Sequence, residues 1–182
     1  MGDETGGRLT RELIAVDGGE CSGLLFDNPV VGLEPALTWT LRIPFAPVGG
    51  DPVLLEIEWL PDTTTGWRHL DGLDVTSKAF ADPAEAVIHH HGHHRYDRAD
   101  VTITAQDGPS VTAAVTLAGD LDGLGPDEIT CTAALRFTGI TVQLRGVAGP
   151  ADALRRLAGH TDTTGLIEID DPRGIAFRFG PG

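Results

Sequence analysis

The stretch ALTWTLRIPF, residues 36–45, alternates between apolar and polar side chains, and this alternation decides the class of the fold. Its apolar face is formed by Leu37, Trp39, Leu41, Ile43 and Phe45. Its polar face carries Thr38, Thr40 and Arg42. A period of two residues is that of a β-strand with one face buried and the other exposed. We therefore expect a strand whose apolar face contributes to a core.

The stretch VLLEIEWL, residues 53–60, repeats the same alternation. Its inward positions are Leu55, Ile57 and Trp59, and its outward positions are Glu56 and Glu58. On this pattern both Trp39 and Trp59 belong to the core. The third tryptophan, Trp67, lies outside any clean alternation, and we expect it to cover the end of the core. Its alternatives are to line a pocket with His69 or to contact a partner.

Further strands are indicated along the rest of the chain. Residues 100–105 and 110–118 flank the turn QDGPS, whose Asp-Gly and Gly-Pro pairs interrupt regular structure. Residues 128–146 resemble a second hairpin folded at Thr138-Gly139. The remaining candidates are 163–170 with 174–179 around DPRG, and 9–16 with 21–27 around DGGE. About ten strands result.

Two short helices are predicted between these strands. The first spans about 83–91, because Asp82, Pro83 and Glu85 have the positions of an N-cap, a first-turn proline and a capping box. The second spans about 150–158, from Pro150 to the glycine that follows. Helices of this length are not stable alone, so both must dock on the sheet.

The expected fold is mainly β, an antiparallel β-sandwich or a partly open barrel of about ten strands with two docked helices. The chain of 182 residues suits one globular β-rich domain over 1–182. The polar residues 1–8 are expected to form a loose N-terminal tail.

The formal net charge of −14 excludes several classes of function. With a single lysine, the chain lacks the clustered basic residues that nucleic acid requires. An acidic surface is also repelled by anionic membranes, and no apolar run is long enough to span a bilayer. With no secretory signal at the start, we expect a soluble cytoplasmic protein whose surface favours a basic protein partner.

The histidine run is the sharpest candidate site. Five of the seven histidines are His89, His90, His91, His93 and His94. A helix ending at Gly92 would divide them into a trio and a pair, which weakens an i,i+4 metal face. We predict no cofactor; a divalent transition metal is the one that these imidazoles would bind, and a solvated loop or a proton-linked switch are the alternatives.

Two weaker candidate sites remain. Arg95, Tyr96 and Arg98 follow the histidines and, together with Trp67, are candidate partner contacts. The loop GDLDGLGPDEI offers Asp120, Asp122, Asp127 and Glu128 as oxygen ligands for calcium, with Leu124 where a third acidic ligand would be expected.

The sequence favours a non-enzymatic acidic binding protein that acts through a protein partner. The nucleophile and phosphate-binding motifs GxSxG, GxxxxGK[ST], GxGxxG and HExxH are absent from the chain. The alternatives are a small-molecule enzyme with a pocket formed by the histidines of the 89–94 run, and a metal-binding or pH-responsive protein. Cys21 and Cys131 are expected to be small core residues with free thiols.

Overall fold

The computed structural model describes residue 9 and residues 13–182, so the predicted tail over 1–8 lies outside the described residues. Within that range the chain is mainly β, with ten strands and one short helix. The strands are β1 (Gly19–Asn28), β2 (Leu33–Val48), β3 (Asp51–Pro61), β4 (Asp74–Thr76), β5 (Glu85–His89), β6 (His93–Asp107), β7 (Ser110–Asp120), β8 (Glu128–Gln143), β9 (Leu166–Ile169) and β10 (Phe177–Pro181). Helix α1 (Pro150–Leu157) lies between β8 and β9, as predicted.

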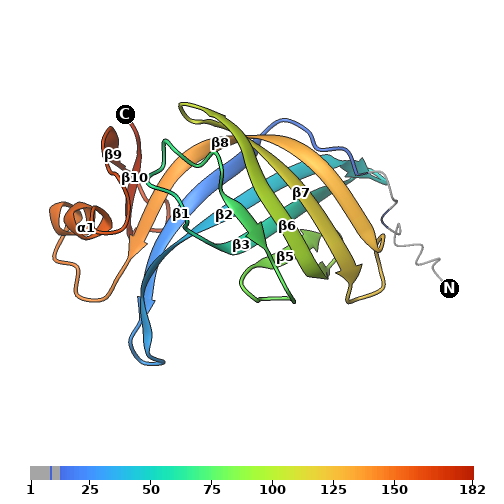
Figure 1. Cartoon of the computed structure of the whole chain (residues 1–182), viewed down its shortest axis with the longest axis horizontal. Helices are drawn as coiled ribbons and strands as arrows, with labels where there is room; N and C mark the ends of the chain where they lie inside the picture. The colour runs from blue at the N-terminus through green and yellow to red at the C-terminus, as the bar shows by residue number, and fades with distance from the viewer. Residues whose placement is uncertain (1–8, 10–12) are drawn as a thin grey trace.

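The hydrogen-bonded order of the strands is β1-β2-β3-β5-β6-β7-β8, and β8 returns to β1. All neighbours in this path are antiparallel except β1 and β8, which are parallel. Seven strands therefore form a closed ring of pairings, and Figure 1 shows them wrapping around one another. β4 adds to β6, while β10 and β9 continue from β8 beside α1.

The core fills the inside of this ring. The alternating residues predicted for β2 are buried, and Trp39, Leu41 and Ile43 are fully enclosed. On β6, β7 and β8 the same period places Val101, Val115 and other β-branched side chains inside. At one end Trp39 meets Phe137 edge-on, with ring centroids 6.2 Å apart. Periodicity therefore identified the buried faces of the long strands.

The predicted helix over about 83–91 is wrong, because this segment is strand β5 followed by a turn. The carbonyl of Asp82 accepts hydrogen bonds from the Lys78 amide and the Ser77 hydroxyl, so the supposed cap belongs to a turn. β5 pairs with β3 on one side and β6 on the other. These two ladders satisfy its backbone and outweigh a capping pattern that contributes about 1 kcal/mol.

The predicted hairpin at Thr138-Gly139 is also wrong, since β8 continues through it from Glu128 to Gln143. Gly139 has a φ of 123°, and a Cβ there would lie 2.5 Å from the carbonyl oxygen of Phe179. The glycine lets the strand bend where β10 approaches closely, rather than reversing the chain.

Only the described part of 9–16 can be compared with prediction, and there Ile14 and Val16 bond to β2 instead of β1.

Trp59 is the third departure from the predicted pattern. Its φ is 65°, and the β2–β3 register shifts beside it, between Trp39/Leu60 and Leu41/Ile57. This bulge adds one residue to β3, so Leu60 takes the inward position and Trp59 points outward with 38% of its surface exposed.

Candidate functional site

The histidine run forms the turn of the β5–β6 hairpin. His89 lies directly opposite His93, and Ile88 lies opposite His94. His90 and His94 are buried, whereas His91 and His93 are exposed. His91 makes the turn with a φ of 55°. Because neighbouring residues of a strand point to opposite faces, the run is divided between the core and the solvent.

A chain of charged groups crosses the outer face of the sheet at this hairpin. Glu56 of β3 forms an ion pair with Arg42 of β2, in which Nε of Arg42 lies 3.4 Å from Oε1 of Glu56. The other oxygen of Glu56 lies 3.2 Å from Nε2 of His89. The rings of His89 and His93 then meet edge-on, with centroids 4.8 Å apart. Four strands are thus linked by side chains outside the core.

The turn itself is joined to the β2–β3 turn. Nε2 of His91 lies 3.1 Å from Oδ2 of Asp51, and Nδ1 of His90 lies 3.4 Å from the carbonyl oxygen of Pro52. Between the two turns is a shallow hollow of about 390 Å³ that His89 and His93 also line. Its lining contains no serine, threonine or cysteine, and its polar side chains are those of Asp51 and the histidines.

The described residues contain no group of three or more His, Cys, Asp or Glu side chains placed to hold a metal ion. His94 explains part of this result. Its Nε2 lies 2.8 Å from the carbonyl oxygen of His90, and its Nδ1 is buried without a partner among the described residues. A buried imidazole that bonds to the backbone of its own hairpin faces away from the exposed histidines.

The four candidate partner contacts do not form one exposed surface. Tyr96 is buried, and its hydroxyl donates to the carbonyl of Pro126 at 3.2 Å. Burial, and then the negative charges of Asp120 and Asp127, raise the pKa of this hydroxyl. Trp67 is buried at 3% exposure against Phe137, in agreement with its predicted place at the end of the core. Arg95 and Arg98 are exposed.

The acidic loop between β7 and β8 uses its carboxylates within the protein. Asp120 accepts hydrogen bonds from the amides of Asp122 and Gly125, which shapes the loop. Asp122 binds Arg95 through two side-chain contacts and one backbone amide. These hydrogen bonds, chiefly the one from the Arg95 side chain, lower the pKa of Asp122 to about 2. Glu128 starts β8 and Asp127 directly precedes it, and among the described residues neither completes a cluster with them.

Sequence reasoning missed a second feature, on the β1–β2 hairpin. This hairpin projects beyond the end of β3 (Figure 1). Exposed apolar side chains at its turn are Val30 at 72%, Val31 at 74% and Leu33 at 46%. Phe26 of β1 meets the exposed ring of Trp59, with centroids 6.3 Å apart. The signal was an apolar pair, VV, in a turn between Pro29 and Gly32.

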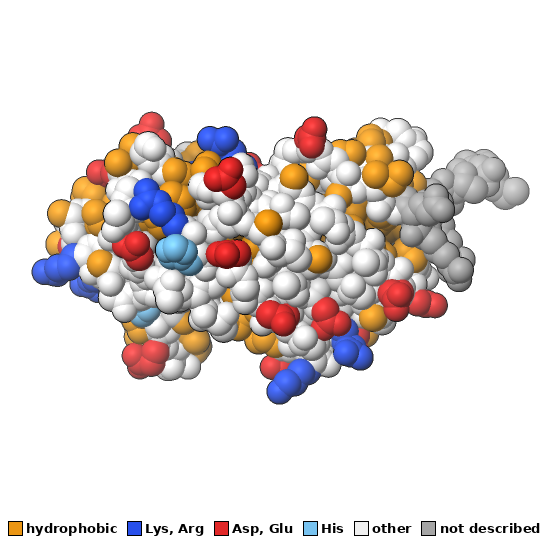
Figure 2. All heavy atoms as spheres, turned by 45° about the horizontal axis from the view of Figure 1, so that its top comes forward, with side chains coloured by type: hydrophobic (Ala, Val, Ile, Leu, Met, Phe, Trp, Pro, Cys, Tyr) orange, Lys and Arg blue, Asp and Glu red, His pale blue; other side chains and the backbone are white. Residues whose placement is uncertain are grey.

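We call the set Phe26, Val30, Val31, Leu33 and Trp59 the apolar hairpin surface. Its surroundings are acidic, because Glu34 and Glu58 belong to the same strands. Burial is the first cause that raises the pKa of Glu58, followed by repulsion from Glu56 and Glu85. Acidic side chains are also dispersed over the face of the molecule in Figure 2.

The two cysteines are free and buried. Burial raises the pKa of the Cys21 thiol to about 12 and that of Cys131 to about 11. A thiol of this kind stays protonated at neutral pH and is a poor nucleophile.

Among the described residues, no helix is both long and apolar enough to span a membrane.

Comparison of the chain with protein-family models, with curated proteins and with solved structures finds no match in any of the three.

Proposed function

We propose that this chain is a non-enzymatic binding protein that holds a protein partner on the apolar hairpin surface. The observation that carries the proposal is the exposed Trp59, whose backbone adopts a φ of 65°. A bulky residue in the left-handed region costs about 1–2 kcal/mol, and such strain is concentrated at functional positions. Here the cost holds an aromatic side chain outside the core, where aromatic residues anchor interfaces.

The neighbouring residues support the same role. Val30, Val31 and Leu33 keep between 46% and 74% of their surface exposed, although the core could hold such side chains. Apolar groups gathered on a projecting hairpin are typical of interaction surfaces. With a net charge of −14 and acids beside the hairpin, the partner that fits is one with an apolar centre and a basic rim.

Of the two expected architectures, we favour the barrel over the sandwich. β1 pairs with both β2 and β8, so the seven-stranded ring leaves no free edge between its first and last strands. In a closed ring the exposed turns and loops at the two ends are the natural places for binding. The β1–β2 turn is one of these.

The proposal is tested by affinity capture from the source cells, followed by titration of the captured partner. The variant Val30→Asp/Val31→Asp should lose at least tenfold in affinity, because charge replaces apolar contact. The matched control Leu121→Asp/Leu124→Asp changes two side chains that are 51% and 55% exposed on another loop, and it should bind normally. Equal affinity of all three proteins, or no saturable partner, would refute the proposal.

The alternative function is pH-responsive, and two contacts favour it. The imidazole of His89 lies 3.2 Å from the carboxylate of Glu56 on a neighbouring strand. The imidazole of His91 lies 3.1 Å from the carboxylate of Asp51 on a neighbouring turn. A charged imidazole binds a carboxylate more strongly than a neutral one does. A partner affinity that changes between pH 7.5 and 5.5 in the native protein, but not in His89→Gln/His91→Gln, would favour this alternative.

The enzyme and metal-binding alternatives have less support. The hollow between the histidine and β2–β3 turns holds imidazoles but no hydroxyl or thiol side chain. A metal would have to use two neighbouring imidazoles, such as those of His89 and His93, together with a ligand from outside the described residues. Elemental analysis of untagged protein tests the metal-binding alternative. A stoichiometric transition metal in the purified protein would support that alternative.

A further inference from the structure

The strands β10 and β9 extend the sheet beyond the closed ring, and β9 ends this extension. β10 pairs with β8 on one side and with β9 on the other. Among the described strands β9 pairs with β10 alone, and Figure 1 shows it at the margin of the molecule. Ile167 and Glu168 of this strand are both exposed, although neighbouring residues point to opposite faces. One edge of β9 is therefore open to another chain.

The register of β9 and β10 decides which backbone groups face this open edge. The amide of Gly182 donates to the carbonyl of Gly165 at 3.0 Å, directly beyond the pair of Leu166 and Pro181. Opposed residues of an antiparallel pair alternate between those that exchange hydrogen bonds and those that do not. Leu166 is therefore of the second kind, which suits its partner Pro181 because proline has no amide hydrogen. By the same alternation, the amide and carbonyl of Glu168 point away from β10.

These backbone groups are unpaired within the described part of the chain. No hydrogen bond there uses the amide or carbonyl of Glu168, or the carbonyl of Leu166. The amide of Leu166 is already used, since it donates to the carbonyl of Thr163 at 3.0 Å. Unpaired groups along a sheet edge are what an extended peptide recognises when it adds a strand. An added strand would therefore centre on Glu168.

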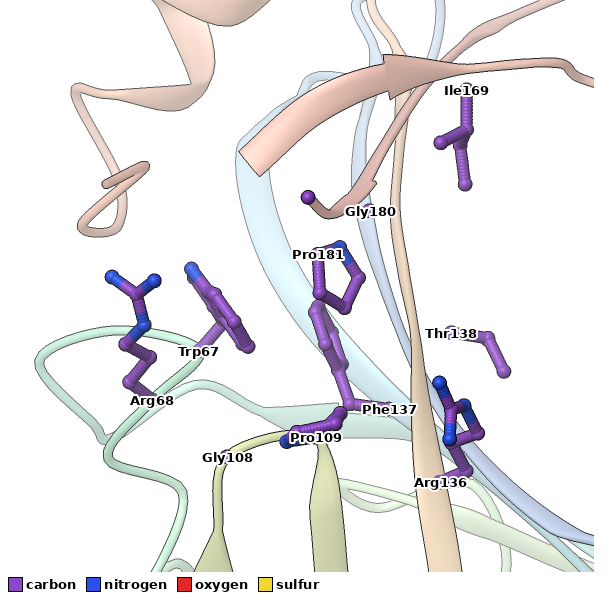
Figure 3. Close-up of a pocket in the computed structure, with 11 residues that line it drawn as sticks. Trp67, Arg68, Gly108, Pro109, Arg136, Phe137, Thr138, Ile169, Gly180 and Pro181 are labelled. Carbon is purple, nitrogen blue, oxygen red and sulfur yellow. The ribbon is translucent and has the colours of Figure 1, made fainter. Parts of the chain in front are cut away.

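One face of β9 presents apolar side chains beside the open edge. Ile167 and Ile169 share this face, because they are two residues apart in a strand. Ile169 lies over Gly180 of β10, where a Cβ would be 2.9 Å from its Cδ1, and Ile167 keeps 54% of its surface exposed. In Figure 3 Ile169 and the buried Trp67 lie on opposite sides of β8, so this apolar face is the outer face of the sheet.

The opposite face of β9 is acidic beside the open edge. Glu168 and, directly after the strand, Asp170 are exposed there. The nearest basic residue along the chain is Arg173, whose charge is offset because its Nε lies 3.9 Å from Oδ1 of Asp171. Antiparallel pairing of two copies about this strand would place one Glu168 opposite the other, which is unfavourable for like charges. The open edge therefore fits a basic partner better than a second copy of the chain.

We propose that the open edge of β9 binds an extended basic segment of another protein, which adds a strand to the sheet. The backbone of the added strand bonds to the amide and carbonyl of Glu168, and its basic side chain lies beside the Glu168 carboxylate. Its flanking apolar side chains rest against Ile167 and Ile169. Backbone bonds supply the affinity of such an interface, and the alternating side chains supply its specificity. The site shares no residue with the apolar hairpin surface, so the two proposals can fail separately.

The test titrates the full chain with acetylated and amidated pentapeptides. The peptide KVKVK should bind saturably in calorimetry, and EVEVE should bind at least tenfold more weakly because its carboxylates face Glu168. N-methylation of the three lysines of KVKVK should abolish binding, because it blocks the backbone donors that face β9. N-methylation of its two valines leaves those donors free and should preserve binding.

Substitutions at Glu168 separate its charge from its backbone. Glu168→Pro removes the free amide without removing a bond to β10. It should bind KVKVK about tenfold more weakly than Glu168→Gln, which is equally uncharged but keeps the amide. Glu168→Lys should reverse the preference between KVKVK and EVEVE. The control Glu128→Lys makes the same change of charge at an exposed position on β8, and it should leave the preference unchanged.

Amide hydrogen exchange locates the added strand. The Glu168 amide should exchange fast in the free protein and slowly with KVKVK bound, whereas the Ile167 amide, which faces β10, should be protected in both states. The proposal is overturned if KVKVK shows no saturation up to millimolar concentration, if EVEVE binds equally well, or if methylated valines impair binding more than methylated lysines do. Protection that appears outside β9, or dimers of the chain that form through β9 in place of peptide binding, would overturn it as well.

Discussion

The ring of Trp59 rests edge-on against the ring of Phe26, with centroids 6.3 Å apart and an interplanar angle of 61°. The contact lies outside the core because the bulge in β3 turns Trp59 outward and Leu60 inward. A single residue of backbone thus moves an aromatic side chain from the expected core face to the surface that we propose for a partner.

The conformation of Trp59 predicts an unusual order of stability. Trp59→Asn should be more stable than Trp59→Val by about 1 kcal/mol, because asparagine tolerates the left-handed region and valine does not. Urea unfolding followed by circular dichroism measures the difference. In a regular strand the order would be reversed, since β-propensity favours valine.

The turn of the histidine run is tested by two substitutions at His91, whose φ is 55°. Both His91→Gly and His91→Ala remove the contact with Asp51, so that loss cancels in the comparison. The glycine variant should be the more stable by about 1 kcal/mol, because alanine is strained at positive φ. A helix over 83–91 would give the opposite order, with alanine more stable by a similar amount.

The acid stability of the protein should depend on Asp122. Its pKa is lowered to about 2 by Arg95, so the contact stabilises the folded state above the ordinary aspartate range and is lost as pH falls towards 2. Asp122→Asn should therefore lower the urea midpoint at pH 7 and have a much smaller effect near pH 2. Asp100→Asn, at an exposed site on β6, serves as the control and should change little at either pH.

The ionised carboxylate of Glu58 should destabilise the folded state, whereas that of Asp122 stabilises it. Its raised pKa means that the folded state disfavours the ionised carboxylate, through burial first and then through Glu56 and Glu85. Glu58→Gln should stabilise the protein at pH 7 by about 0.5 kcal/mol or less, since solvent screens this half-exposed group. The gain should disappear below the ordinary glutamate pKa, where Glu58 is protonated in both states. A gain that persists at pH 3 would contradict this explanation.

The two thiols should be unreactive in the folded protein. With pKa values raised to about 12 and 11, Cys21 and Cys131 contain almost no thiolate at pH 8. Labelling with a disulfide reagent should therefore be slow under native conditions and become fast for two thiols in denaturant. Rapid labelling of one native thiol would indicate an opening that exposes it.

The sequence predicted the strands well where alternation extended over many residues. In β2 a period of two over ten residues identified every buried side chain from Leu37 to Phe45. Where the signal was a short capping pattern, as at Asp82 and Pro83, prediction failed. Five residues of β5 carry too little periodicity to compete with local cues, and their pairing partners are distant in sequence.

For the candidate sites too, local patterns were visible in the sequence and pairings between distant segments were not. The histidine run was visible as a composition, but its split between core and solvent depended on the strand register, in which His89 and His93 are opposite each other. The sequence predicted a hairpin where β9 and β10 lie, but not which of its edges is open. That edge belongs to β9, because the other edge of β10 is taken by β8.

The amino-acid sequence alone determined that the protein is β-rich and acidic, and which faces of its long strands are buried. These properties follow from composition and from the two-residue period, both of which are local. The tertiary structure alone decided that β1 closes against β8, that Trp59 faces outward and that one edge of β9 is left open. These features depend on pairings between distant segments, whose register and gaps no local pattern encodes.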